Sequence, residues 1–360
     1  MAGVRMKEEG VMEDYLKPAV KLLSRYAAEG KIPGAALALV TREGVTSACV
    51  GNASLLPENV PLTADRLFDL ASVTKVLATT TLALQCLEEG LFTLSTPVSA
   101  ILPDFPHQQV TIGHLLTHTS GVCSDDKAYK KRKDRADLTR FFYEKPLDFT
   151  PGSRVLYSDF GYITLGYAIE AVYGKLDERF QTCIAKPLEM RDSGYLPSER
   201  GLVGRCVPTE LTEERGLICG TVHDGKAFLL GGVSGNAGLF STLEDMTHYV
   251  RMILDDGEYR GRSVLKRATV RLLKHCYTEG LNERRTLGWW SNERSMSFGD
   301  YYSESCIYHT GFTGTSVYID FMRQCGIILL TNRIHPARDN PWIGEIRNTV
   351  HNVILSQITC

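Results

Sequence analysis

The sequence lacks several features that mark whole classes of protein. Its 360 residues carry 40 Lys and Arg against 42 Asp and Glu, so there is no excess of basic residues for binding nucleic acid. A basic tract at 127–135 is short and flanked by aspartate, which favours a solvated surface. No segment offers the roughly 18 uninterrupted apolar residues of a membrane-spanning helix. We therefore expect neither nucleic acid nor a membrane as a partner.

Signals for export, metals and redox chemistry are also missing. The first twenty residues carry charges where a signal peptide has its apolar centre. The ten cysteines are scattered, and no C-x-x-C pair indicates a zinc ribbon or a dithiol site. His114 and His118 have the spacing of metal ligands, but no glutamate lies between them. We expect a soluble, cytoplasmic protein without metal or cofactor, and its oligomeric state stays open.

Strand patterns occur near both ends of the chain, and helical patterns fill the middle. Short apolar runs between turn residues predict strands at 34–40, 45–50, 305–309, 315–321 and 326–331. Helical spacing of apolar residues predicts helices at 15–29, 73–89, 112–116, 138–144, 161–173, 243–254, 265–276 and 342–356. An isolated hairpin is only marginally stable, so the first two strands must find partners among the last three.

This order of elements predicts an α+β fold with two packed lobes. An antiparallel sheet built from both termini and flanked by helices forms one lobe, from residues 1–70 and 240–360. A mostly helical lobe, residues 71–239, is inserted between them. The crevice between two packed lobes is the natural place for an active site.

The sharpest local pattern is Leu70-Ala-Ser-Val-Thr-Lys75. Ser72 and Lys75 are nearly one helical turn apart, so their side chains share a face. If Ser72 begins the helix, its N–H is unsatisfied and lies at the positive end of the helix dipole. A serine hydroxyl needs a base, which a lysine can supply when its pKa is lowered. S-x-x-K also arises by chance and Ser72 could simply cap the helix, but the almost uncharged helix favours a functional Lys75 over a snorkelling one.

Two further segments carry residues suited to acyl chemistry. A Pro-Gly turn at 151–152 leads to Tyr157, directly before a helix that Ser158 or Asp159 caps. The Tyr157 phenol could carry a proton if it lies beside a cation; otherwise it is a buried tyrosine next to a cap. The second segment, 308–315, ends one strand and leads into the next, either as a plain turn or with a glycine that lets substrate approach the backbone.

In order and spacing, these segments resemble the motifs of penicillin-recognising serine hydrolases, most of all the class C β-lactamase branch: S-x-x-K, Y-x-N and K-T-G. Segments 115–121 and 232–245 resemble the same proteins, and the resemblance runs from about residue 16 to 355. It implies that Ser72 attacks an acyl carbon while Lys75 and Tyr157 share its proton. It implies an oxyanion hole from the N–H groups of Ser72 and Phe312. The resemblance further implies substrate-binding roles for Asp159, His309, Thr310 and Gly311.

The sequence departs from the family pattern at two of these positions. Asp159 stands where asparagine is usual and is expected to hold Lys75 charged, unless it caps the following helix instead. His309 replaces a lysine that supports recognition of a carboxylate, and a neutral imidazole binds a carboxylate less well. Both departures disfavour efficient β-lactam hydrolysis and leave acyl-serine chemistry intact.

The pattern as a whole predicts a serine hydrolase that acts on a small-molecule ester, amide or peptide through an acyl-Ser72 intermediate. Esterase or peptidase activity is favoured. The alternatives are a true β-lactamase or DD-carboxypeptidase, an acyltransferase, and a penicillin-binding sensor that is acylated without turnover. The presence of Lys75 with Tyr157, which would activate water for deacylation, disfavours the sensor. The sequence assigns no role to His223 and Asp224.

Overall fold

An antiparallel sheet of six strands organises the fold. The computed structural model describes residues 9–292 and 298–358. Along the sheet the strands follow the order β10-β11-β12-β1-β2-β3, and every neighbouring pair is antiparallel. The strands are β1 (Gly34–Thr41), β2 (Val45–Ser54), β3 (Val60–Pro61), β10 (Cys306–Thr310), β11 (Ser316–Asp320) and β12 (Cys325–Thr331).

The sheet joins the two ends of the chain at its centre. Leu37 of β1 lies opposite Ala48 of β2 on one side and Leu329 of β12 on the other. Both central strands, β1 and β12, are buried along their whole length, which explains their near-continuous apolar sequences. The predicted α+β class, with an antiparallel sheet drawn from both termini, is confirmed.

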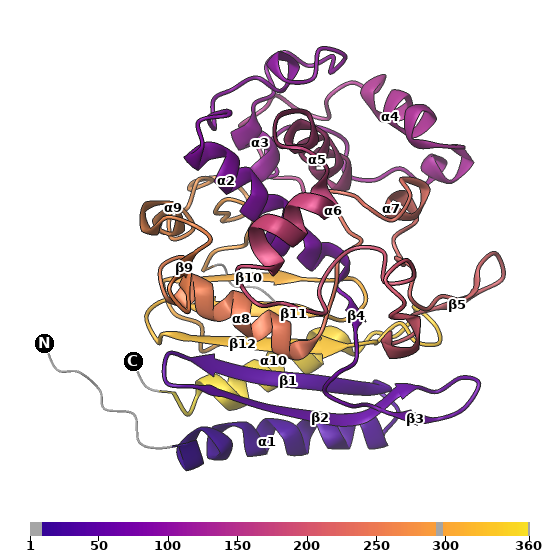
Figure 1. Cartoon of the computed structure of the whole chain (residues 1–360), viewed down its shortest axis with the longest axis vertical. Coiled ribbons are helices and arrows are strands. Elements are labelled where there is room, and N and C mark those ends of the chain that lie inside the picture. Colours follow the sequence, from indigo (N-terminus) through magenta and orange to yellow (C-terminus); the bar gives the residue numbers. More distant parts are fainter. Residues whose placement is uncertain (1–8, 293–297, 359–360) are drawn as a thin grey trace, which may run out of the picture.

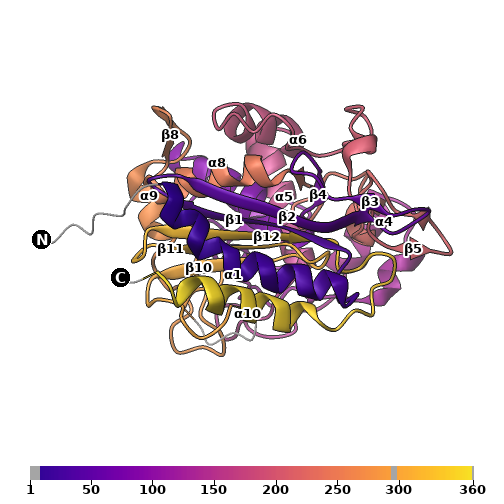
Figure 2. The same ribbon diagram turned by 90° about the horizontal axis from the view of Figure 1, so that it is seen from below.

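Helices cover both faces of the sheet because side chains alternate along each strand. Leu37 and Leu329 face α1 (Glu9–Ala28) and α10 (Ile343–Leu355), which lie side by side on one face (Figures 1 and 2). Ala36, Ile328 and Leu330 face the opposite way into the main core, where α8 (Leu243–Leu254) packs on β1 and β12.

The remaining helices stack above that second face (Figure 1). They are α2 (Thr81–Glu88), α3 (Ile112–Leu116), α4 (Arg135–Tyr143), α5 (Asp159–Tyr173), α6 (Leu176–Arg179), α7 (Gly225–Leu229) and α9 (Arg267–Leu272). Short strands β4 (Phe68–Asp69) and β7 (Phe240–Ser241) pair with each other, and so do β5 (Leu211–Thr212) with β6 (Gly216–Leu217) and β8 (Glu258–Tyr259) with β9 (Arg262–Ser263). No helix in the described part of the chain has the length and apolar character needed to cross a bilayer.

Two helices differ from their predicted form. The helix predicted at 73–89 begins as a 3₁₀ turn, η1 (Ala71–Val73), continues as a π-helical stretch, η2 (Lys75–Thr80), and becomes regular only in α2. Such local departures from α geometry are typical of functional sites. The helix predicted at 265–276 is shorter: α9 ends at Leu272, and the next three N–H groups bind carbonyls three residues back, as in a 3₁₀ turn.

Candidate active site

The turn that carries Ser72 is fixed by a buried carboxylate. Asp69, at the end of β4, accepts a hydrogen bond from the Ala71 N–H at 2.8 Å, and Ala71 adopts the left-handed conformation with φ of 47°. A non-glycine residue in this region costs about 1–3 kcal/mol and persists only where the surroundings impose it. Thr315 imposes it from the sheet by donating to the Leu70 carbonyl at 3.0 Å. The half-buried Ser72 therefore sits on a strained, firmly held turn.

Lys75 lies fully buried one turn after the serine. Its ammonium has three N–H donors, and each has a partner: Ser72 Oγ at 3.0 Å, Asp159 Oδ1 at 2.7 Å and the Asn236 carbonyl at 2.8 Å. Burial works to lower the pKa of Lys75, but the charge of Asp159 and the contact with Tyr157 raise it above its ordinary value. Lys75 is thus an ammonium in the resting protein.

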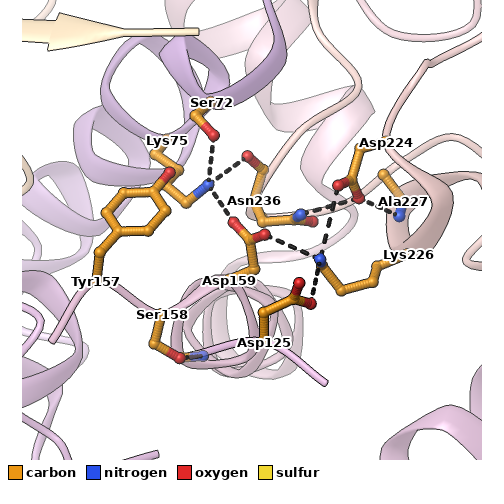
Figure 3. Close-up of polar contacts among 12 residues, drawn as sticks. Ser72, Lys75, Asp125, Tyr157, Ser158, Asp159, Asp224, Lys226, Ala227 and Asn236 are labelled. Carbon is orange, nitrogen blue, oxygen red and sulfur yellow. Dashed lines mark hydrogen bonds and ion pairs between the residues drawn. The ribbon is translucent and has the colours of Figure 1, made fainter. Parts of the chain in front are cut away.

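Tyr157 is held by its ring, and its hydroxyl lies near Ser72 and Lys75 (Figure 3). The ring packs at 4.6 Å from His118 and lies parallel to Trp290 at 6.1 Å, with the Lys75 ammonium 4.9 Å from its centre. Burial raises the pKa of Tyr157, although hydrogen bonds and charge from Lys75 and Ser72 act to lower it. The resting phenol is therefore protonated.

Asp159 binds Lys75 because its neighbour Ser158 performs the capping. Ser158 Oγ accepts the Gly161 N–H at 2.9 Å and so satisfies the first turn of α5. Asp159 is left free to place one carboxylate oxygen on Lys75 and the other on Lys226, at 3.0 Å. Burial alone would raise the pKa of Asp159, but the two lysines hold it well below its usual range. The alternative in which Asp159 caps the helix is wrong.

His309 and Thr310 form the end of β10, and Gly311 follows them. His309 is fully buried, so its imidazole presents no surface for a carboxylate. Burial lowers its pKa well below the ordinary value, and its Nδ1 binds the Thr310 carbonyl at 3.0 Å. A Cβ on Gly311 would lie 2.4 Å from the Leu70 carbonyl. The glycine therefore lets this strand end pack closely on the Ser72 turn. The half-buried Thr310 lies at the same end of β10.

Two backbone amides beside Ser72 are free to bind a ligand oxygen. Within the described residues, neither the Ser72 N–H nor the Phe312 N–H donates to a protein acceptor. The Phe312 peptide is fixed on its other side, because the Arg333 side chain donates to its carbonyl at 3.0 Å. These are the two amides that the family resemblance assigns to an oxyanion hole.

Sequence reasoning missed Lys226 and Asn236. Lys226 is only 4% exposed and lies on α7, and Asn236 belongs to the glycine-rich loop that follows. This loop lies within the segment 232–245 that resembles the family, and the Asn236 carbonyl contacts Lys75 directly. A lone lysine in the otherwise apolar run KAFLL was the available signal, as it was for Lys75.

His223 and Asp224 now have contacts. The His223 ring stacks on the half-exposed Phe312 at 5.6 Å, and its Nε2 binds Glu210 at 2.8 Å. Asp224 caps α7 by accepting the Ala227 N–H at 2.8 Å and also accepts the Asn236 side-chain amide at 3.1 Å. His223 therefore packs on Phe312, and Asp224 holds the loop that carries Asn236.

His114 and His118 take separate hydrogen bonds. His114 Nδ1 accepts the Thr111 N–H at 3.2 Å as part of a capping box, and His118 Nδ1 accepts the Ser158 N–H at 3.1 Å. Each ring thus has its own structural partner. The two histidines act on different segments, and neither contacts the other.

A serine hydroxyl beside a buried lysine and a phenol is the arrangement of a serine hydrolase that uses no histidine base. A family model described as "Beta-lactamase" matches residues 19–349. The chain belongs to the β-lactamase family of serine hydrolases.

Individual relatives differ in the activity their names give. The chain is 32% identical to an N-acetylmuramyl-L-alanine amidase of Bacillus subtilis, over 92% of this chain and 84% of the relative. It is 30% identical to a candidate D-alanyl-D-alanine carboxypeptidase of Salmonella agona, over 81% and 75%. Among solved structures, EstCE1, a hydrolase with promiscuous acyltransferase activity, aligns with a TM-score of 0.77 at 20% identity, over 96% of this chain and all of that one. This last similarity establishes the fold alone.

Proposed function

We propose that the protein hydrolyses an ester or amide through a covalent acyl-Ser72 intermediate. The observation that carries this proposal is the 3.0 Å contact between Lys75 Nζ and Ser72 Oγ, made by a fully buried lysine beside Tyr157. Strongly perturbed groups gathered in one site are a mark of catalysis.

Acylation forms one bond and breaks one. Ser72 Oγ attacks the acyl carbon, and its proton passes to the Lys75–Tyr157 pair. The carbonyl oxygen becomes an oxyanion that the N–H groups of Ser72 and Phe312 stabilise; one such donor is worth about 10²–10³ in rate. The bond from the acyl carbon to the leaving group then breaks, and the leaving alcohol or amine takes up the proton. Water repeats the same steps and releases the acid.

The protonation state in which the Lys75–Tyr157 pair can act as a base is only a small fraction of the resting protein. Lys75 is charged and Tyr157 is neutral at rest, so the pair must first lose one proton before it can accept another from Ser72. Lys75 and Tyr157 titrate as a coupled pair, so the loss of this proton has one apparent pKa that belongs to the pair and to neither residue alone. Activity is therefore expected to rise with pH until the pair is deprotonated.

The chemistry of the site and the names of the relatives support a substrate class. We propose an amide or ester, including D-amino-acid peptides or muropeptides, in keeping with the N-acetylmuramyl-L-alanine amidase and D-alanyl-D-alanine carboxypeptidase names of the relatives. The buried, neutral His309 supplies no cation for a β-lactam carboxylate, so β-lactams are expected to be poor substrates.

A cytoplasmic location remains part of the proposal. Each cysteine in the described part of the chain is free, which suits a reducing compartment.

Paired assays test the proposal. A p-nitrophenyl short-chain ester and a chromogenic cephalosporin are offered to the wild type, to Ser72→Ala and to the control Ser95→Ala, which alters an exposed serine. We expect ester turnover that Ser72→Ala abolishes and Ser95→Ala leaves unchanged. Equal activity of Ser72→Ala would show that the nucleophile is wrong. A stable adduct without product release would instead favour an acylated sensor.

A further inference from the structure

Lys226 is a buried cation for which the acyl-transfer scheme has no use. It lies on α7, and its side chain is 5% exposed. Its ammonium contacts carboxylates from three separate segments: Asp125 at 3.0 Å, Asp159 at 3.0 Å and Asp224 at 3.8 Å. Lysines are almost never buried without such pairing. The three carboxylates therefore require a positively charged side chain at this position, and a long neutral side chain would not serve.

Asp159 connects this cation to the reacting groups. One of its oxygens binds Lys75 and the other binds Lys226, so two lysines share a single carboxylate. A closed ring of polar contacts results (Figure 3): Asp224 binds Lys226 and the Asn236 side chain, and the Asn236 carbonyl returns to Lys75. The ring links α7 to Ser72 through only two intermediate side chains.

We propose that Lys226 is a positioning residue that offsets the negative charge of Asp159 and thereby lets the Lys75–Tyr157 pair give up a proton at a lower pH than it would beside Asp159 alone. An aspartate at this position, taken alone, favours the charged form of Lys75 and opposes ionisation of Tyr157. A second lysine on the same carboxylate weakens both effects. The inference rests on the proposed function, because it concerns the proton that Ser72 must lose.

The direction of the effect does not depend on which member of the pair holds the proton. Removing the positive charge of Lys226 makes deprotonation harder for an ammonium and for a phenol alike. Removing the negative charge of Asp159 makes it easier for both. The two substitutions must therefore move the pH dependence in opposite directions, and their combination must return it toward the wild type.

Other charged groups near the pair stay constant across these substitutions. His118 and His309 pack around Tyr157 and are both buried, with pKa values well below the ordinary range, so they remain neutral. The Arg285 guanidinium lies 5.9 Å from the Tyr157 ring and is paired with Glu283. On the side of Lys226, the Tyr129 ring at 4.9 Å and the carboxylates of Asp125 and Asp224 complete the surroundings.

A charge cycle tests the proposal. The value of kcat/KM for p-nitrophenyl acetate is measured from pH 5 to 10 for the wild type, Lys226→Met, Asp159→Asn and the double variant. We expect the acidic limb to move to higher pH in Lys226→Met, with about a tenfold loss at pH 6, and to lower pH in Asp159→Asn. The double variant should lie close to the wild type. Lys226→Arg should restore the wild-type limb, because it keeps the charge.

Controls separate a charge effect from a structural one. Lys145→Met removes another lysine from an ion pair, with Asp126 at 2.6 Å, and should leave the limb unmoved. If Lys226→Met and Asp159→Asn change kcat/KM in the same direction, or Lys226→Met changes KM alone, Lys226 is only structural and the proposal is overturned. If Lys226→Met does not fold, an unmoved limb in Asp159→Asn overturns it equally. Activity that survives Ser72→Ala refutes the proposed function itself, which is a different outcome.

Discussion

The hydroxyl of Tyr157 can be removed with little change to anything else, which makes Tyr157→Phe an informative substitution. The ring is held by packing on His118 at 4.6 Å and on Trp290 at 6.1 Å, and by the Lys75 ammonium over its face. Because burial raises the pKa of the phenol, phenylalanine removes a neutral group at pH 7. The free energy of unfolding should therefore fall by about 0.5–1.5 kcal/mol, the value of one hydrogen bond.

The expected effect on catalysis is much larger. A group that moves a proton in the transition state typically contributes about 10²–10⁴ in rate, or about 2.7–5.4 kcal/mol of activation free energy. We expect kcat/KM for a p-nitrophenyl ester to fall by that factor in Tyr157→Phe. The difference between a small stability loss and a large kinetic loss is the signature of a proton carrier.

Tyr249→Phe provides the matched control. Its hydroxyl is fully buried and hydrogen-bonded to Thr81 at 2.9 Å, but it does not contact Ser72. This variant should lose similar stability, measured by urea unfolding, and keep ester turnover within about threefold. If Tyr157→Phe also stays within threefold of the wild type, Tyr157 does not transfer the proton and the account of the site fails.

Three further outcomes follow from the contacts around the site. Gly311→Ala places a Cβ 2.4 Å from the Leu70 carbonyl. The free energy of unfolding in urea should fall by about 1–3 kcal/mol and kcat by about 10²-fold. Normal turnover would contradict the packing role of Gly311. Ser158→Ala removes the cap of α5 and should cost about 1 kcal/mol, whereas an unchanged unfolding midpoint would refute it. The lowered pKa of Asp159 gives stability that is present above about pH 3.9 and lost as pH falls, so Asp159→Asn should flatten the acid side of the stability curve; an equal slope would exclude this.

The sequence predicted what depends on local spacing. Ser72 and Lys75 are three residues apart, and Tyr157 stands directly before a capped helix, so their approach needs only helix geometry and the packing of one helix on another. The sheet was predictable for a similar reason, because the strands near both termini needed partners. The π-helical stretch after Lys75 left no sign in the apolar pattern.

Contacts between segments far apart in the chain were not predictable. Lys75 contacts Asn236, which lies 161 residues further along the chain, and nothing in either residue type predicts this contact. His309 pairs with Val317 of β11, and a change of one residue in register would have placed its side chain on the opposite face of the sheet. The role of Asp159 likewise depended on Ser158 taking the cap, which only the structure decides.

Trapping the intermediate tests the central claim most directly. The protein is mixed with excess p-nitrophenyl acetate, quenched in acid within milliseconds to seconds, digested and analysed by mass spectrometry. The account predicts an acetyl group on the peptide that contains Ser72, accumulated in a burst and absent from Ser72→Ala. An adduct on another residue, or the same adduct in Ser72→Ala, would contradict it.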